Sequence, residues 1–165
     1  MERTRTTTAR RSRSAPWCNW CWRASRPGIA QWIQETIASI VQTGYSRSIT
    51  GRSRDLFDAN TNTSWGWRKV RQGVNFQVQS LASDLTQLAI LTTHQAIRRE
   101  GIDAHLLLNV HDQLALEFRG LSNSEMSQIV RHCMVQRVPE EFERRFGLPV
   151  GVRLNIDINI GERWS

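Results

Sequence analysis

HLLLNVHDQLALEF (residues 105–118) places three polar side chains between two short apolar runs. The runs LLLNV and LALEF have the composition of β-strands, and two strands joined by a tight connection predict an antiparallel hairpin. The connection holds His111, Asp112 and Gln113, without a glycine or an Asn-Gly pair. An aspartate at a turn can bond its own backbone, so turn chemistry by itself explains Asp112. An imidazole, a carboxylate and a carboxamide in one turn also indicate a functional site.

The residues after this hairpin predict helices and a final strand. Ser122 and Glu125 have the spacing of a capping box that opens a helix. The apolar residues that follow at helical spacing are Met126, Ile129, Val130, Cys133 and Met134. We expect Pro139 to interrupt this helix and a short second helix to end at Gly147. VGVRLNIDINI (residues 150–160) alternates without a fault, which predicts a strand with one buried face.

The residues before the hairpin predict a helix and a smaller hairpin. Pro27 suits the first turn of a helix, and Gly44 stands where a C-terminal cap belongs. The apolar residues at helical spacing between them are Ile29, Ile33, Ile37, Ile40 and Val41. GYSRSITGRSRDL (residues 44–56) predicts a small hairpin that turns at Thr50-Gly51 and carries arginines on its flanks.

A long helix is expected between these two hairpins, from about residue 67 to residue 99. Its predicted apolar stripe contains Val74, Val78, Leu81, Leu85 and Leu88. Gly73 should weaken it by about 1 kcal/mol relative to alanine. Arg71, Asn75 and Gln79 lie four residues apart, so they share one edge of the helix beside that stripe. A solvated edge and a binding edge both account for three such side chains.

Length and composition describe one domain preceded by a tail. A chain of 165 residues with 39% hydrophobic content can bury a real core. Residues 1–26 show no helical or strand periodicity and hold seven arginines and one glutamate, so we interpret them as a disordered or unrelated arm. Residues 27–165 are the predicted domain. Its helices and hairpins predict the α+β class, an antiparallel sheet packed against helices.

Charge and cysteine content narrow the partners and the compartment. The domain has one positive stretch, which contains Arg47, Arg52, Arg54, Arg68, Lys69 and Arg71. These side chains could either bind phosphates or face solvent. Cys18 and Cys21 have the spacing of half a zinc site, but no second pair completes it. Three cysteines make no disulfide framework, which favours a reducing, cytoplasmic location. No apolar run approaches the roughly 18 residues that span a membrane, so no membrane partner is predicted.

Two motifs resemble those of family A DNA polymerases, the group of bacterial polymerase I and its phage and organellar relatives. NVHDQLALEF resembles their third signature motif, usually written VHDE. RQGVNFQVQSLASD is similar to their R-x-x-x-N-x-P-x-Q-G-T-A-A-D helix, although Gln77 and Ser80 replace the usual proline and glycine. The residues in register with that helix are Arg71, Asn75, Gln79, Ala82 and Asp84.

Two further segments extend the resemblance over residues 27–165. The segment that begins at Pro27 and ends at the predicted arginine hairpin looks like the one between the second motif and the palm core of these enzymes. INIGERW matches their G-x-x-W ending at Gly161 and Trp164. Four matches in the same order are much more specific than any one of them. The resemblance implies the C-terminal part of a palm.

The resemblance also implies roles for the site residues. Asp112 would be one of the two aspartates that bind the Mg²⁺ pair of nucleotidyl transfer, and His111 would lie beside the primer terminus. Gln113 stands where the family has glutamate. Its carboxamide keeps the shape of the glutamate side chain but lacks the negative charge. The residues implied in primer-template DNA binding are Arg71, Asn75 and Gln79, with phosphate contacts from Arg52 and Arg54. Deoxynucleoside triphosphates would be the substrates of the completed enzyme.

Two family motifs do not occur in this sequence: the DYS-like first motif and the K-x-x-x-F-G-x-x-Y-like fingers helix. One aspartate cannot hold two cations ~3.5–4 Å apart, so the 165-residue chain is expected to be inactive in DNA replication or repair synthesis unless a partner chain supplies both motifs. A truncated gene, a split gene or a frame error would each produce such a chain. A non-catalytic nucleic-acid-binding remnant is the alternative. A third hypothesis, a metal-dependent phosphohydrolase, would combine His111 and Asp112 with His94, His105 or His132.

Overall fold

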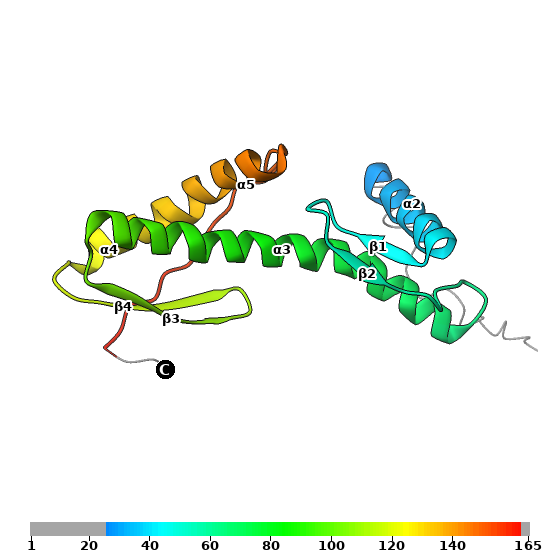
Figure 1. Cartoon of the computed structure of the whole chain (residues 1–165), viewed down its shortest axis with the longest axis horizontal. Helices are drawn as coiled ribbons and strands as arrows, with labels where there is room; N and C mark the ends of the chain where they lie inside the picture. The colour runs from blue at the N-terminus through cyan, green and yellow to red at the C-terminus, as the bar shows by residue number, and fades with distance from the viewer. Residues whose placement is uncertain (1–25, 163–165) are drawn as a thin grey trace, which may run out of the picture.

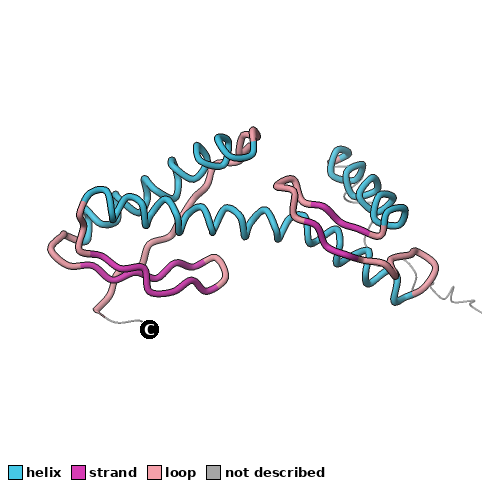
Figure 2. The backbone as a smooth tube through the Cα atoms, viewed as in Figure 1, coloured by secondary structure: helices cyan, strands magenta, loops and turns pink. Residues whose placement is uncertain are grey.

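The computed structural model describes residues 26–162 and is organised around one long helix, α3 (Ser64–Glu100) (Figure 1). At 1.5 Å per residue, a helix of 37 residues is about 55 Å long. One helix and one hairpin pack at its N-terminal end, and the remaining elements pack at its C-terminal end (Figure 2). The predicted long helix is therefore confirmed. It begins three residues earlier than expected, because the Thr63 hydroxyl caps it by accepting from the Gly66 N–H at 3.0 Å.

The N-terminal end holds α2 (Pro27–Thr43) and the hairpin of β1 (Tyr45–Arg47) and β2 (Ser53–Asp55). α2 ends as predicted at Gly44, which adopts φ +72° and donates its N–H to the Ile40 carbonyl at 2.9 Å. The predicted apolar stripe of α2 is only partly buried. Ile40 is 1% exposed, whereas Ile29 and Val41 are exposed to solvent, because only one face of the C-terminal half of α2, with Thr36 and Ile40, is buried.

Gly73 brings the N-terminal hairpin close to α3. A Cβ at this position would lie 2.5 Å from Leu56 Cδ1 and 2.6 Å from Ile40 Cδ1, two buried side chains of the same core cluster. The Ser46 hydroxyl donates to the Gly73 carbonyl at 2.7 Å. The expectation that Gly73 merely weakens the helix was therefore incomplete, since it also permits this close approach. The placement of Val78 in the apolar stripe was wrong, because 59% of Val78 is exposed.

The C-terminal end holds the second hairpin, β3 (Ala104–Val110) and β4 (Gln113–Phe118), which pair antiparallel as predicted. An irregularity between Leu106 and Leu108 leaves Leu107 as an extra residue in β3. Because a bulge reverses the alternation of side chains, Leu106 faces the core and Leu108 does not.

A continuous helical segment follows, in three parts: α4 (Asn123–Arg131), the π-helical segment η1 (His132–Arg137) and α5 (Val138–Phe146). The capping box of Ser122 and Glu125 is confirmed. Pro139 was expected to interrupt the helix, but the helical segment continues through it. It lies in the first turn of α5, where its missing N–H is tolerated, and the Val138 N–H reaches back five residues to the Cys133 carbonyl.

The prediction of a strand at residues 150–160 was wrong, because this last described segment forms no strand. Leu154, Ile156 and Ile158 do pack against the two C-terminal core clusters, so the alternation correctly marked a partly buried side. Val152, in the same series, is 69% exposed. Alternation reports burial, whereas a strand also requires a neighbour that pairs with its backbone, and no described strand does so here.

The α+β class is confirmed, with one correction to its sheet. The described strands form two separate two-stranded sheets, and each packs against α3 instead of joining one larger sheet. No helix in residues 26–162 combines the length and apolarity needed to cross a membrane.

Candidate functional site

Arg71, Asn75 and Gln79 occupy one exposed face of the N-terminal half of α3. Successive members are four residues, or about 6 Å, apart along the helix axis. The buried side of this half contains Val70 and Gly73, which face α2 and the N-terminal hairpin. The predicted shared edge is therefore confirmed as a solvent-facing surface of one guanidinium and two carboxamides.

Positive charge concentrates at this end of the molecule. Residues 26–80 contain seven basic and three acidic residues, whereas residues 81–162 contain eight basic and eleven acidic residues. Arg47 and Arg54 on the hairpin and Arg68 on α3 are exposed. Such a surface attracts polyanions, and the attraction weakens as salt rises.

Arg52, predicted to contact phosphate, is held by the protein itself. Its Nε and Nη2 lie 2.7 Å and 2.6 Å from Asp84 Oδ1, and the Thr50 hydroxyl donates to Asp84 Oδ2 at 2.5 Å. Asp84 is only 6% exposed, so its carboxylate depends on these donors. We call Thr50, Arg52 and Asp84 the hairpin latch. It fixes the β1–β2 turn to α3, and no local pattern connects residues more than thirty positions apart.

Asp112 stands at the tip of the β3–β4 hairpin. Val110 pairs with Gln113, so the turn contains two residues, His111 and Asp112, and Gln113 begins β4 instead of belonging to the turn. His111 adopts φ +56°, a value rare for residues other than glycine. The side chains of all three residues are exposed. In Figure 1 this tip and the β1–β2 turn both point toward the middle of α3.

The described residues do not fit a two-metal site. Residues 26–162 contain no group of three or more histidine, cysteine, aspartate or glutamate side chains that could hold a metal ion. Asp112 offers a single carboxylate, and Gln113 offers a neutral amide in place of a second. The phosphohydrolase hypothesis also loses support, because His94, His105 and His132 form no such group with Asp112. Cys18 and Cys21 lie outside the described residues.

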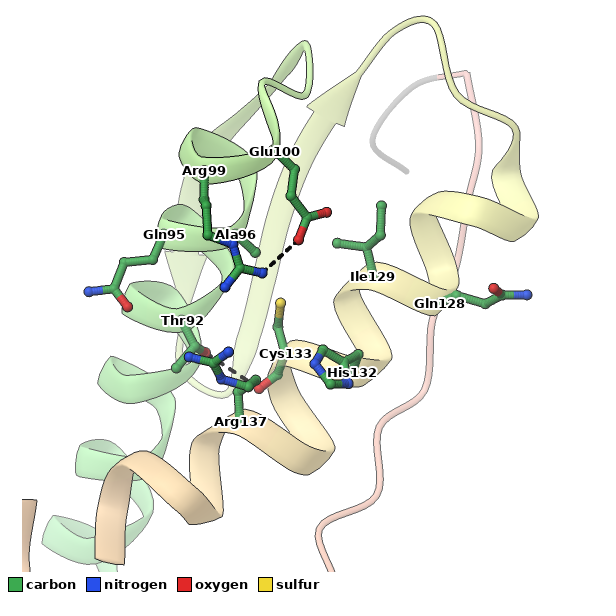
Figure 3. Close-up of a pocket in the computed structure, with 10 residues that line it drawn as sticks. All are labelled: Thr92, Gln95, Ala96, Arg99, Glu100, Gln128, Ile129, His132, Cys133 and Arg137. Carbon is green, nitrogen blue, oxygen red and sulfur yellow. Dashed lines mark hydrogen bonds and ion pairs between the residues drawn. The ribbon is translucent and has the colours of Figure 1, made fainter. Parts of the chain in front are cut away.

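A cavity of about 490 Å³ lies away from these residues, between the C-terminal half of α3 and the α4–η1 region (Figure 3). Thr92, Arg99, Cys133 and Arg137 are among the residues that line it. Burial raises the pKa of the Cys133 thiol, so the sulfur stays protonated at neutral pH. His132, a candidate of the phosphohydrolase hypothesis, lines this cavity, but none of the residues predicted to bind DNA or metal in the polymerase does.

Comparison with known proteins gives one consistent result. The model of the family described as DNA polymerase family A matches residues 14–165. DNA polymerase I of Chloroflexus aurantiacus is 28% identical over 142 residues, which cover 86% of this chain and 14% of that protein. The DNA polymerase of Bacillus phage SP01 is 26% identical over 143 residues, which cover 84% of this chain and 15% of that protein. The chain thus spans about one seventh of the length of these relatives.

A solved structure shares the fold. The POL domain of Pol1 from M. smegmatis, in complex with DNA primer-template and dNTP, aligns with a TM-score of 0.61 and 25% identity. The alignment covers 68% of this chain and 20% of that one. The family match begins ahead of Pro27, and the boundary that we drew between residues 26 and 27 stays a prediction.

Proposed function

This chain belongs to DNA polymerase family A, and on that premise we propose that it binds primer-template DNA through the exposed face of α3. The observation that carries the proposal is the alignment of Arg71, Asn75 and Gln79 on one solvent-facing surface at the positive end of the molecule. Duplex DNA, the partner named for the M. smegmatis POL domain, has the complementary charge.

The chemistry of the three side chains suits a DNA backbone and minor groove. A guanidinium presents a planar fork of donors to phosphate oxygens. Carboxamides donate to the N3 and O2 acceptors that every base pair shows in the minor groove, so they hold DNA with little regard to sequence. Arg54, exposed on β2, would add a phosphate contact. Arg52 would act mainly through the hairpin latch, with its third nitrogen left for phosphate.

Catalysis requires more than this chain supplies. We propose that Asp112 contributes one carboxylate to a composite centre, in which a partner chain with the first and second polymerase motifs provides the rest. Mg²⁺ and deoxynucleoside triphosphates would bind only to that assembly, in the cytoplasm of a bacterial or phage-infected cell. The 165-residue chain alone should not extend a primer, since residues 26–162 hold no candidate metal group.

DNA binding can be tested by fluorescence anisotropy with a labelled duplex at low and moderate salt. The triple variant Arg71→Ala, Asn75→Ala, Gln79→Ala should lose about tenfold or more in affinity, and its salt dependence should be shallower by about one charge. A matched control is Gln87→Ala, Gln95→Ala, Arg98→Ala, which removes the same kinds of exposed side chain from the C-terminal half of α3. Equal losses in both variants would refute a specific binding face.

A non-catalytic DNA-binding remnant is the second candidate, and Gln113 together with the missing metal group favours it. The two candidates differ in a reconstitution experiment. If the chain is mixed with a polypeptide that carries the first and second motifs, primer extension that requires Asp112 would establish the composite enzyme. DNA binding that Asp112→Ala leaves unchanged, with no extension in any mixture, would establish the remnant.

A further inference from the structure

Trp65 is an exposed aromatic side chain in the first turn of α3. About half of it, 52%, remains accessible to solvent. Trp67, two residues later, packs against the N-terminal core cluster, so that cluster already has a tryptophan of its own. Trp65 lies toward the same side of the helix as Asn75 and Gln79, since positions ten and fourteen residues apart differ by about 80° and 40° around a helix.

Two cations flank the Trp65 ring. The Arg68 guanidinium carbon lies 5.5 Å from the ring centroid, and the Lys69 ammonium nitrogen lies 5.1 Å from it. Both distances fall within the ~6 Å range of a cation–π contact. A partly exposed aromatic ring beside two positive charges is a combination that can hold single-stranded nucleic acid, because bases stack on the ring while phosphates contact the cations.

We propose that Trp65, Arg68 and Lys69 form a stacking platform for the single-stranded DNA that continues beyond the duplex. This inference rests on the proposed DNA-binding function of α3 and extends it to a second class of DNA. Bases of any sequence can stack on Trp65, and Arg68 and Lys69 exchange their ring contacts for contacts to phosphate.

The spacing along the helix leaves room for two separate DNA contacts. Trp65 precedes Arg71 by six residues, which corresponds to about 9 Å along the axis. A DNA that contacts both residues must therefore extend over at least this distance along α3. A base that stacks on Trp65 must be unpaired or terminal, because base faces inside a duplex are covered by the neighbouring pairs. Residues 44–79 contain six basic and two acidic residues, so this end attracts polyanions. Charge therefore favours nucleic acid as the occupant over a protein surface with few acidic residues.

The test compares two labelled DNAs, a blunt duplex and the same duplex with a short single-stranded extension. The chain should bind the extended DNA more tightly than the blunt one. Trp65→Ala should lower the affinity for the extended DNA roughly tenfold and leave the affinity for the blunt duplex unchanged. Trp65→Phe should retain most of the additional affinity that the extension provides. Phe57→Ala is the matched control, since Phe57 is an aromatic side chain at the same end and is 74% exposed.

The outcomes separate this inference from the function on which it rests. Binding to blunt duplex with no gain from the extension, or an equal loss on both DNAs in Trp65→Ala, would overturn the platform and leave duplex binding intact. Failure to bind either DNA would overturn both. Double substitution of Arg68→Ala and Lys69→Ala should make the salt dependence shallower for the extended DNA by about two charges. An unchanged salt dependence would also contradict the platform.

Discussion

The two ends of α3 differ in packing and in charge. The N-terminal end has one small core cluster built on Ile40, Leu56, Ala59 and Val70, and an excess of basic residues. The C-terminal end has two clusters, to which the hairpin, the α4–α5 segment and the last described residues all contribute, and an excess of acidic residues. One helix thus joins a positively charged, thinly packed end to a more extensively packed one.

The difference shows how one face of a helix can stay exposed while the other contributes to folding. At the N-terminal end, polar contacts such as the hairpin latch and the Ser46–Gly73 hydrogen bond supplement a small apolar core. They leave the opposite face of α3, which we propose binds DNA, exposed to solvent. At the C-terminal end, more apolar side chains pack into two clusters, so we expect most of the free energy of unfolding to arise there.

The largest effect should come from the C-terminal core. Phe142 is 2% exposed and contacts Phe146, with the ring centroids 4.8 Å apart. Phe142→Ala should lower the free energy of unfolding by about 3–5 kcal/mol, because it removes a buried ring and leaves a cavity. Urea denaturation measures the change. The exposed Phe57→Ala loses only an edge-on contact with Tyr45 and should stay within about 1 kcal/mol of the parent. Similar losses in the two variants would remove the proposed contrast between the ends.

A smaller and more local effect should follow from Asp84→Ala. The variant removes the acceptor of the hairpin latch, but Arg52 can turn to water because 57% of its side chain is exposed. We therefore expect a loss of about 1–3 kcal/mol rather than the larger cost of a fully buried pair. Hydrogen exchange should accelerate at the Ser48 N–H, which donates to the Arg52 carbonyl, and at the Arg52 N–H, which donates to the Ser48 hydroxyl. It should not accelerate in β3–β4. Exchange that accelerated equally at both hairpins would show that the ends unfold together.

The smallest effect concerns two glycines in helices. Gly73→Ala gains about 1 kcal/mol of helix propensity but forces Ile40 and Leu56 apart, at about 1–3 kcal/mol, so we expect a net loss of about 1 kcal/mol. Gly28→Ala meets no atom within 4 Å and should instead stabilise α2 slightly. Thermal unfolding of both variants provides the comparison. Stabilisation by Gly73→Ala would mean that the N-terminal core is looser than the contacts of Gly73 indicate.

Most elements of this fold could be predicted because their signals are local. Gly44 and Gly147 end helices at the predicted positions, since glycine adopts positive φ without a steric penalty. Ser122 and Glu125 satisfy each other's backbone donors within one turn. The sequence also identified the polar face of Arg71, Asn75 and Gln79, because helical periodicity alone places residues four apart on one side.

Other features depended on residues far apart in the sequence. The ion pair of Arg52 with Asp84, which gives an expected phosphate ligand a structural contact, joins positions with no common periodicity. Trp65 and Trp67 are the same residue type two positions apart, yet Trp65 is exposed and Trp67 contacts the core. Their difference follows from which side of α3 the N-terminal hairpin covers.

The sequence by itself determined the caps, the turns and the faces of helices, because each rests on backbone conformation or spacing within a few residues. Only the tertiary structure decided that residues 150–160 pack without pairing in a strand and that the β3 bulge turns Leu108 away from the core cluster. Alternation of apolar residues records that one side is buried. Which neighbour buries it, and whether that neighbour offers hydrogen bonds, depends on chain segments brought together only by folding.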